Sequence, residues 1–460
     1  MNLNKKYYTL FFTILILLSC RKYVDIPAPN NQLVKELVFS DDKTATATVA
    51  GLYGAFNSYN SSLGNVLTNF LPAFSADEFR YIHNSANYDE FSENSLSTSN
   101  TSIRSIWDNA YSRIYHANAI IEGLSTAPGV SAPVKQQLIG EAKFIRAYCY
   151  FYLVNYFGDV PLVLNTDFKT NTSLPRTSLN DVYAKIIEDL SEAQSALGDN
   201  YPTAERIRAN KTAATALLAR VYLYRGDWVK AEAEATKVIS NTNYQLLTDL
   251  NAIFLKNSLE TIMQWQTTNT STTGVNTWEG FSIVPATPTS NTGYYAYDSF
   301  LAAFETGDQR KNSWIKAITI SGNTYYHPYK YKIRTGSPVL EYSMVLRLAE
   351  QYLIRAEARA QQNNLDGARS DVDKIRQRAG LIGLSSLLTK DQLLEAIAQE
   401  RRIELFAEGG HRWFDLKRTG QALTVLTPIK PNITSKDLLY PLPLDAMLTN
   451  PNLVQNPGYN

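Results

Sequence analysis

Hydrophobic positions recur at helical spacing along most of the chain, and most strongly at residues 138–164. One apolar stripe there advances by alternating steps of four and three and contains Leu138, Ala142, Ile145, Cys149, Tyr152 and Tyr156. Phe144, Tyr148 and Phe151 add a second apolar face, so the predicted helix should be covered on most sides. Signals for its ends are Ser131 before it and Gly158 after it. We call this helix the pillar and expect the fold to be arranged around it.

Several other segments predict antiparallel helix pairs. At residues 211–240, small Ala219 and Ala231 flank a Gly-Asp-Trp turn, and residues 346–378 repeat this arrangement around an Asn-Asn-Leu-Asp turn. Such alanines allow two helices to approach closely, as in tetratricopeptide repeats. The pillar and an amphipathic helix at 178–197 would form a third pair. The predicted fold class is mainly α: a tetratricopeptide-like scaffold of helical pairs (an α/α superhelix), with long loop-rich insertions and a few short strands.

Two segments depart from helical spacing. Residues 74–102 are rich in Asn and Ser and predict a long loop of the kind that usually has a function. Residues 241–341 are rich in Thr, Asn, Gly, Pro and aromatic residues, and alternate only at 262–266 and 329–333, which predict short strands. We expect about half of these rings to pack beneath loops and the others to form an exposed stacking platform. Such a platform suits the C–H faces of sugar rings.

The N-terminus carries a targeting signal. Lys5 and Lys6 precede a short apolar run that ends in Leu-Leu-Ser before Cys20. The run is too short to span a membrane comfortably and fits a signal peptide at residues 1–19. Its end resembles a bacterial lipobox, in which Cys20 is lipidated; an ordinary signal peptide cut elsewhere is the alternative. Residues 20–40 would be an extended tether because of Pro27 and Pro29.

The rest of the 460-residue chain shows no clean division. We predict an N-terminal helical scaffold at 41–240, the loop-rich aromatic region at 241–341, and C-terminal helices with an extended tail at 342–460, all packed as one unit. The 44 basic and 43 acidic residues are balanced and interspersed, which argues against a nucleic-acid surface, since that would need a basic stripe.

Chemistry-bearing motifs are scarce. The four histidines have no metal-ligand spacing, and no phosphate loop or nucleophile motif is present. If Cys20 carries lipid, no disulfide can form, and Cys149 is read as a small buried hydrophobe. We therefore predict no catalytic residues, no metal and no cofactor, while an ion that orders a loop, such as calcium, is left open.

A charged motif lies at residues 399–420. Arg401, Glu404 and Glu408 stand at i, i+3 and i+7, which predicts one stripe of one helix, so the two glutamates repel unless cations meet them. The nearest suppliers in the sequence are Arg402, Arg412, Lys417 and Arg418. Two carboxylates beside a histidine would suit a glycosidase. We favour a paired internal network of Arg401, Glu404, Glu408, Arg412 and Asp415, because buried charges persist only when partnered.

Four motifs together resemble the SusD/RagB family of surface glycan-binding lipoproteins. They are E-A-x-F-x-R-A-x-x-Y-F-Y-L with G-D-V-P-L in the pillar, C-R-K-Y-V-D-I-P-A-P at the tether, E-R-x-x-E-L-x-x-E-G with R-x-x-D-L-x-R in the charged motif, and P-L-P with N-P-x-L-x-Q-N-P-G-Y near the C-terminus. In the family the charged motif is structural. The present chain has one extra residue in the turn before Arg412, which leaves the partner of Arg412 open.

The resemblance implies a helical lipoprotein on the outer face of the outer membrane, which binds glycan and covers a SusC-like TonB-dependent transporter without catalysing a reaction. By analogy, the first loop would contribute the ligand contacts Asp77, Arg80, Tyr81, His83 and Asn84. From the aromatic region we predict the ligand contacts Trp278, Tyr294, Tyr295, Tyr297, Trp314 and Tyr326. The alternatives are a lipoprotein for a non-glycan nutrient, a lipoprotein that assembles with protein partners through its helical repeats, and a glycoside hydrolase.

Overall fold

A computed structural model of the chain describes residues 38–83, 85–268 and 274–459. The predicted signal peptide, Cys20, most of the tether and the candidate ligand residue Asn84 lie outside the described residues.

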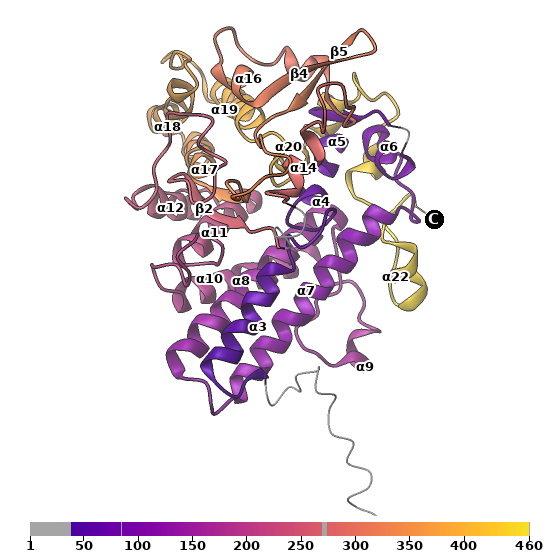
Figure 1. The fold of residues 1–460 in the computed structure, drawn as a ribbon, viewed down its shortest axis with the longest axis vertical. Helices are drawn as coiled ribbons and strands as arrows, with labels where there is room; N and C mark the ends of the chain where they lie inside the picture. The colour runs from indigo at the N-terminus through magenta and orange to yellow at the C-terminus, as the bar shows by residue number, and fades with distance from the viewer. Residues whose placement is uncertain (1–37, 84, 269–273, 460) are drawn as a thin grey trace, which may run out of the picture.

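The pillar is helix α8 (Ala132–Phe157), and its predicted bounds are confirmed. Every residue from Phe144 to Val154 is buried, because α3 (Asp42–Gly54), α7 (Thr101–Thr126) and α10 (Leu179–Ala196) pack around it. Figure 1 shows α3 and α7 crossing in front of α8. Gly158 ends the helix with φ +73°. The hydrophobic periodicity of this segment thus locates the centre of the molecule.

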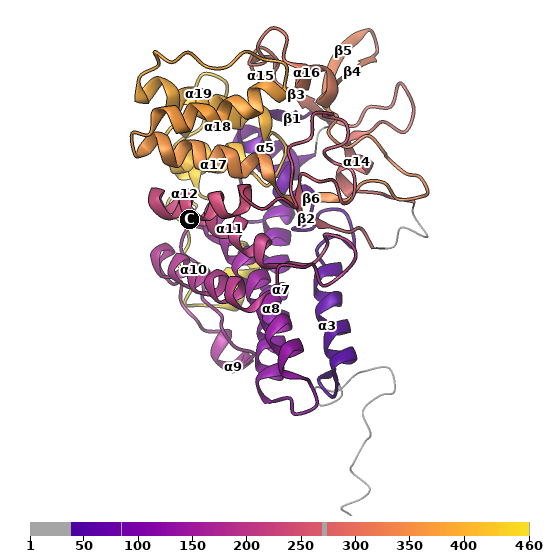
Figure 2. The same ribbon diagram turned by 90° about the vertical axis from the view of Figure 1, so that its left-hand side faces the viewer.

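The predicted helix pairs are present and stack upon one another. They are α11 (Lys211–Arg225) with α12 (Trp228–Ile239), and α17 (Leu348–Gln361) with α18 (Leu365–Arg378), followed by α19 (Lys390–Glu404). Gly226 makes the turn of the first pair with a left-handed φ of 69°, and the side chain of Asp227 then caps α12. Figure 2 shows α10, α11, α12, α17, α18 and α19 in succession along one side. This arrangement confirms the mainly α, tetratricopeptide-like fold class.

Within the described residues, the strands form three antiparallel two-stranded sheets. They are β1 (Phe79–Tyr81) with β3 (Tyr294–Ala296), β2 (Thr261–Trp265) with β6 (Ser343–Arg347), and β4 (Ile315–Ile320) with β5 (Asn323–Pro328). The strand predicted at 262–266 is confirmed as β2, but the one predicted at 329–333 is wrong. The backbone N–H groups of Lys332 and Ile333 donate to the carboxylate of Glu341, so they are not available to a neighbouring strand.

Residues 74–102 are also more ordered than the predicted loop. They contain the end of α5 (Leu71–Ser75), the strand β1 and the helix α6 (Ala86–Glu93), and α7 begins at Thr101. The shorter helices elsewhere are α4 (Val66–Asn69), α9 (Phe168–Asn171), α14 (Trp278–Ile283), α15 (Asp298–Leu301), α16 (Gln309–Trp314), α20 (His411–Arg418), α21 (Ala422–Leu426), the 3-10 helix η1 (Ser435–Leu438) and α22 (Leu444–Thr449).

The C-terminal tail, which is extended apart from the short helix α22, lies against the pillar. Tyr440 donates its backbone N–H to the carbonyl of Tyr156 at 2.8 Å. The side-chain amide of Asn456 donates to the carbonyls of Phe157 and Tyr440 at 2.9 and 2.8 Å. Among the helices of the described ranges, none combines the length and the apolar character needed to span a bilayer.

Candidate functional site

A group of aromatic side chains gathers where β1 pairs with β3. The register places Tyr81 opposite Tyr294, and their rings lie 5.3 Å apart, edge to face. Tyr81 also meets the ring of Tyr88 at 4.8 Å and that of His83 at 5.6 Å. Tyr294 is buried and forms the floor, Tyr81 and Tyr88 are half-buried, and His83 is exposed. These rings therefore offer partly accessible apolar surface on a fixed base.

The loop before β3 holds two of these rings in place. His83 Nε2 lies 3.2 Å from the carbonyl oxygen of Asn291, in a hydrogen bond. The side-chain oxygen of Asn291 accepts from the hydroxyl of Tyr295 at 2.6 Å and from the backbone N–H of Gly293 at 2.9 Å. Gly293 lies directly against the rings of Tyr81 and His83.

A second pair of rings stands on α14, next to the first group. The indole N–H of Trp278 donates to the carbonyl of Asn57 at 3.2 Å, and its ring meets Phe281 at 5.6 Å. The guanidinium of Arg334 stacks on Phe281, 4.1 Å from the ring centre. Trp278 and Phe281 are both half-buried.

Ser282 connects the two groups of rings. Its hydroxyl accepts from the side-chain amide of Asn60 at 3.4 Å. Burial raises the pKa of Tyr294 well above its ordinary value, while a hydrogen bond with Ser282 opposes that rise. We call the set Tyr81, His83, Tyr88, Trp278, Phe281 and Tyr294 the ring site. Half-exposed rings beside amides and hydroxyls can cover the C–H face of a sugar and bind its hydroxyl groups.

Asp77 does not belong to the ring site, and its prediction as a ligand contact is wrong. Its side chain is buried and accepts two hydrogen bonds from Arg412, at 2.7 and 2.9 Å, while Arg402 lies 2.8 Å away. Burial would raise the pKa of Asp77, but these arginines lower it below its ordinary value. Asp77 is thus the partner of Arg412 that the sequence left open.

Three of the predicted aromatic contacts are also interior. Trp314 is fully buried and donates its indole N–H to the carbonyl of Leu250 at 3.0 Å. Tyr295 is 1% exposed and lies under Tyr325 at 4.7 Å, and Tyr294 supports the other rings from below. Trp314 and Tyr295 therefore present no face to a ligand.

The other predicted contacts lie at the surface. Arg80 and His83 are exposed, Tyr81, Trp278 and Tyr297 are half-buried, and Tyr326 is 38% exposed on β5. Tyr81 and His83 contact each other in the ring site, and Trp278 belongs to its second pair of rings, on α14. The structure places Arg80 over the ring of Tyr297, at 5.8 Å, on the other face of β1.

The sequence prediction missed Tyr88 and Phe281. Tyr88 stands seven residues after Tyr81, in a segment that was expected to be a loop although its Asn-Tyr-Asp-Glu-Phe stretch forms α6. Phe281 follows Trp278 by three residues, and this spacing puts the two rings on one side of a helix.

The glutamates of the charged motif lie away from the ring site, in the protein interior. Glu404 contacts Arg310 at 3.0 Å and Arg347 at 2.5 Å, and pairs with Arg378. Burial would raise the pKa of Glu404, but Arg378, Arg347 and Arg310 hold it well below its ordinary value. The carboxylate is therefore no proton donor.

Glu408 is fixed in the same way. It contacts Lys330 at 2.5 Å and Arg347 at 2.7 Å. Against the opposing effect of burial, Arg347 and Lys330 lower its pKa. Neither glutamate lies in an open cleft, so this carboxylate pair is not a glycosidase centre.

Two details of the charged motif correct the sequence prediction. The helix α19 ends at Glu404, and Glu408 follows in a turn where Ala407, Gly409 and Gly410 have positive φ, so the two glutamates do not share one helix. The cations that meet them are Arg310, Lys330, Arg347 and Arg378 from distant segments, in place of the expected neighbours. Those neighbours have other partners: Arg402 and Arg412 bind Asp77, and Arg418 binds Asp415 at 2.7 Å, as Arg401 also does.

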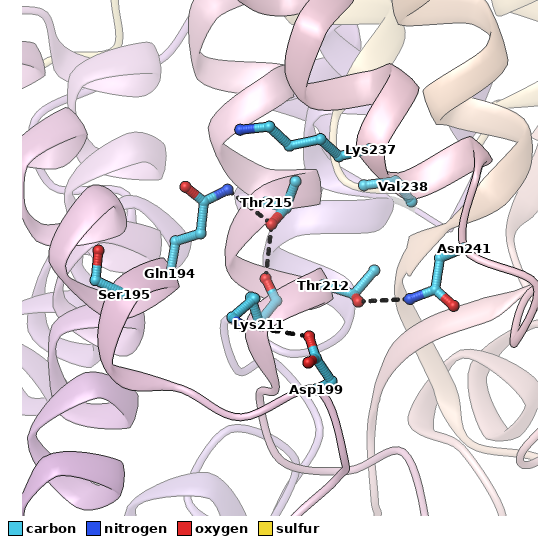
Figure 3. A pocket seen from close by; sticks show the side chains of 9 residues that line it. All are labelled: Gln194, Ser195, Asp199, Lys211, Thr212, Thr215, Lys237, Val238 and Asn241. Atoms are coloured by element: carbon cyan, nitrogen blue, oxygen red, sulfur yellow. Dashed lines mark hydrogen bonds and ion pairs between the residues drawn. The ribbon is translucent and has the colours of Figure 1, made fainter.

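A separate cavity of about 380 Å³ lies between α10, α11 and α12 (Figure 3). Its polar groups bond to one another: Gln194 donates to Thr215 at 2.8 Å, Asn241 donates to Thr212 at 3.1 Å, and Lys211 pairs with Asp199. None of the described residues that line it is aromatic. The cavity therefore has no surface on which a sugar ring could stack.

The described residues contain no group of three or more His, Cys, Asp or Glu side chains placed to hold a metal ion. Burial raises the pKa of the Cys149 thiol to about 12, which suppresses its reactive thiolate form.

Comparison with known proteins gives the family. A model described as "Starch-binding associating with outer membrane" matches residues 23–223, and a second, described as "SusD family", matches residues 254–459. The chain belongs to the SusD/RagB family. The resemblance of its four sequence motifs is thereby confirmed.

Individual SusD relatives match between two thirds of this chain and nearly all of it. SusD-like protein P2 of Formosa agariphila is 28% identical over 99% of this chain and 100% of its own. Starch-binding protein SusD of Bacteroides thetaiotaomicron is 25% identical over 69% of this chain and 72% of its own. A solved laminarin-binding SusD-like protein is 26% identical, with a TM-score of 0.78 over 91% of this chain and 100% of that one.

Proposed function

We propose that this SusD-family protein binds a glycan at the ring site and passes it to a SusC-like TonB-dependent transporter in the outer membrane. The observation that carries the proposal is the ring site itself. Half-exposed Tyr81 and Tyr88 stand on the buried ring of Tyr294, and half-exposed Trp278 stands on α14, with amides and hydroxyls beside these rings. Relatives that are named for binding starch and laminarin support a sugar as the ligand.

Attachment to the membrane would come from lipidation of Cys20, with the globular part facing the cell exterior. The family model described as associating with the outer membrane supports this location. An anchor keeps the binding site close to its transporter, so a weak affinity at each site suffices for capture.

The protein acts in this proposal as a binder. Glu404 and Glu408, which offered the alternative of a hydrolase, are buried and held by cations. The helical repeats remain available for protein partners, and a transporter is the partner that the family suggests.

The test uses the mature chain without its anchor, residues 21–460, on laminarin, starch and a wider panel of polysaccharides. We expect at least one polysaccharide to retain the protein without being degraded. Trp278→Ala and Tyr81→Ala should each weaken binding by about tenfold, which is the loss expected for an aromatic contact of ~1.4 kcal/mol. Tyr115→Ala is the matched control, because this half-exposed tyrosine stands on α7 outside the ring site.

Three results would contradict the proposal. Release of reducing sugar would favour an enzyme. Failure of every polysaccharide to retain the protein would favour a protein-binding or non-glycan role. Equal binding by Trp278→Ala, Tyr81→Ala and the control would place the glycan elsewhere on the surface.

A further inference from the structure

A cavity of about 320 Å³ opens beside Tyr297, on the side of β1 that faces away from the ring site. We call it the Tyr297 cavity. The end of α6 and the segment before η1 form its walls, with Ser92, Glu93, Ser95, Tyr297, Lys430 and Asn432 among the lining residues. Figure 1 shows α6 in front of the yellow C-terminal segment that supplies the opposite wall.

This cavity adjoins the ring site through a single strand. Successive residues of a strand point to opposite faces, so Tyr81 faces the other rings while Arg80 extends over Tyr297. The backbone N–H of Tyr81 donates to the hydroxyl of Ser92 at 3.3 Å. The backbone N–H of Tyr297 donates to the carbonyl of Glu78 at 3.1 Å, directly before β1. The neighbouring residues Tyr81 and Arg80 of β1 therefore face the ring site and the side of the Tyr297 cavity, respectively.

The charges around the Tyr297 cavity disfavour an anionic ligand. Lys430 is buried in the wall and its ammonium donates to the carbonyls of Phe74 and Ser75 and to the side-chain oxygen of Asn94. All three of its N–H groups are thus engaged by the protein, and none is left for a ligand carboxylate, sulfate or phosphate. The carboxylates of Glu93 and Asp437 would also repel an anion.

The same groups disfavour a cation. Lys430 and Lys436 lie in the same walls as Glu93 and Asp437, so the lining contains basic as well as acidic side chains. The oxygen Oδ2 of Asp437 already accepts from the backbone N–H and the hydroxyl of Thr434, at 2.8 and 2.9 Å. What the cavity offers is an apolar wall from Tyr297, Ile429 and Pro431, with the hydroxyls of Ser92 and Ser95 and the amide of Asn432 around it. This combination suits a neutral ligand that is rich in hydroxyl groups.

We propose that the Tyr297 cavity is a second sugar subsite, which takes a neutral sugar unit of the same glycan chain that the ring site holds. The inference rests on the proposed glycan-binding function and extends it to the length of chain that is recognised. A glycan that is bound at one subsite is held at a high effective concentration near the other. A glycan long enough to reach both subsites therefore binds more tightly than one that reaches a single subsite.

The test is isothermal titration of residues 21–460 with two series of oligosaccharides of increasing length, one from laminarin and one from starch. For the wild type we expect the affinity to rise about tenfold once the chain is long enough to occupy both subsites. Tyr297→Ala removes the apolar wall, and Ser95→Trp fills the cavity from its exposed rim. Both variants should lose this tenfold gain in affinity. The gain is measured relative to the affinity for the shortest oligosaccharide that binds.

Two further variants separate this inference from the proposed function. Trp278→Ala should weaken binding of every chain length, and Tyr115→Ala should leave the wild-type length dependence intact. If Trp278→Ala loses binding while Tyr297→Ala and Ser95→Trp keep the gain with length, the glycan site stands and the second subsite is excluded. If no chain of either series binds to the wild type, both are excluded. Circular dichroism and thermal midpoints of all variants show that each one is folded.

Discussion

Gly293 has no side chain, and its φ of +83° lies in the left-handed region that favours glycine. A Cβ at this position would lie 2.6 Å from carbon atoms of both Tyr81 and His83. The close approach of the backbone allows these two rings to rest on the loop before β3. A residue with no chemistry of its own therefore sets the shape of the ring site.

We expect Gly293→Ala to weaken glycan binding by about tenfold, because the added methyl group pushes Tyr81 and His83 out of position. The matched control is Gly307→Ala, where φ is +90° and no atom lies within 4 Å of the new Cβ. Both variants carry the strain of a left-handed alanine, about 1–2 kcal/mol, and only the first one meets the rings. Titration with the polysaccharide found for the wild type gives the comparison. Equal affinities of the two variants would show that the rings do not depend on Gly293.

At the residue scale, the sequence predicts which residue types a glycan site uses but not which of them are accessible. Trp278 and Trp314 are of the same residue type and lie in the same aromatic region. Trp278 is half-exposed, whereas Trp314 is enclosed and bound to a carbonyl 64 residues away. Its burial depends on segments whose position only the tertiary structure determines, so no local pattern distinguishes the two.

At the element scale, the pillar α8 and its neighbour α10 are joined by two ion pairs in different surroundings. Arg146 binds Asp189 through two hydrogen bonds of 2.7 and 2.8 Å, and both side chains are at most 5% exposed. Lys143 pairs with Glu192 at the surface, where Glu192 is 46% exposed. The same two helices thus provide a buried pair and an exposed pair for comparison.

We expect Asp189→Asn to lower the free energy of unfolding by about 3–5 kcal/mol, because it leaves the buried charge of Arg146 without a carboxylate. Glu192→Gln should cost at most about 1 kcal/mol, since water screens an exposed pair. Urea denaturation of the two variants measures both values. Similar losses would mean that α8 and α10 are held together by apolar packing alone.

The elements themselves were predictable to different degrees. The bounds of α8 and the turn between α11 and α12 follow from local signals: apolar spacing, Gly158, Gly226 and the cap at Asp227. Strands were less predictable, because β1 pairs with β3 more than 200 residues later along the chain. Residues 329–333 alternate as a strand would, yet a glutamate side chain takes their backbone donors.

At the scale of the whole molecule, buried charges join the aromatic region to the C-terminal helices. Glu404, at the end of α19, binds Arg310 of the aromatic region, Arg347 of β6 and Arg378 of α18. The sequence pattern required cations near Glu404, and the presence of such cations is confirmed. It could not identify them, because they come from segments 26 to 94 residues away that only the folded chain brings together.

We expect Glu404→Gln to destabilise the whole protein by about 3–5 kcal/mol at neutral pH, because three buried arginines lose their shared carboxylate. Glu395→Gln is the matched control, since Glu395 is exposed on the same helix. The difference in the free energy of unfolding between the wild type and Glu404→Gln should depend on pH. The arginines hold the pKa of Glu404 in the folded state well below the ordinary value of 4.5, so on acidification the unfolded state takes up the proton first.

The stability that Glu404 provides is therefore present above pH 4.5 and is lost progressively as the pH falls below it. The amide introduced by Glu404→Gln does not titrate, so the gap between wild type and this variant should narrow in acid, while the control follows the wild type. Urea denaturation over a pH series measures this difference in the free energy of unfolding. A second probe that reports on the tryptophan side chains shows whether the protein still unfolds in a single transition. A gap that stays constant with pH would mean that the pKa of Glu404 is the same in the folded and the unfolded protein. Two separate transitions in the wild type would show that the aromatic region and the C-terminal helices fold independently, in spite of the charges between them.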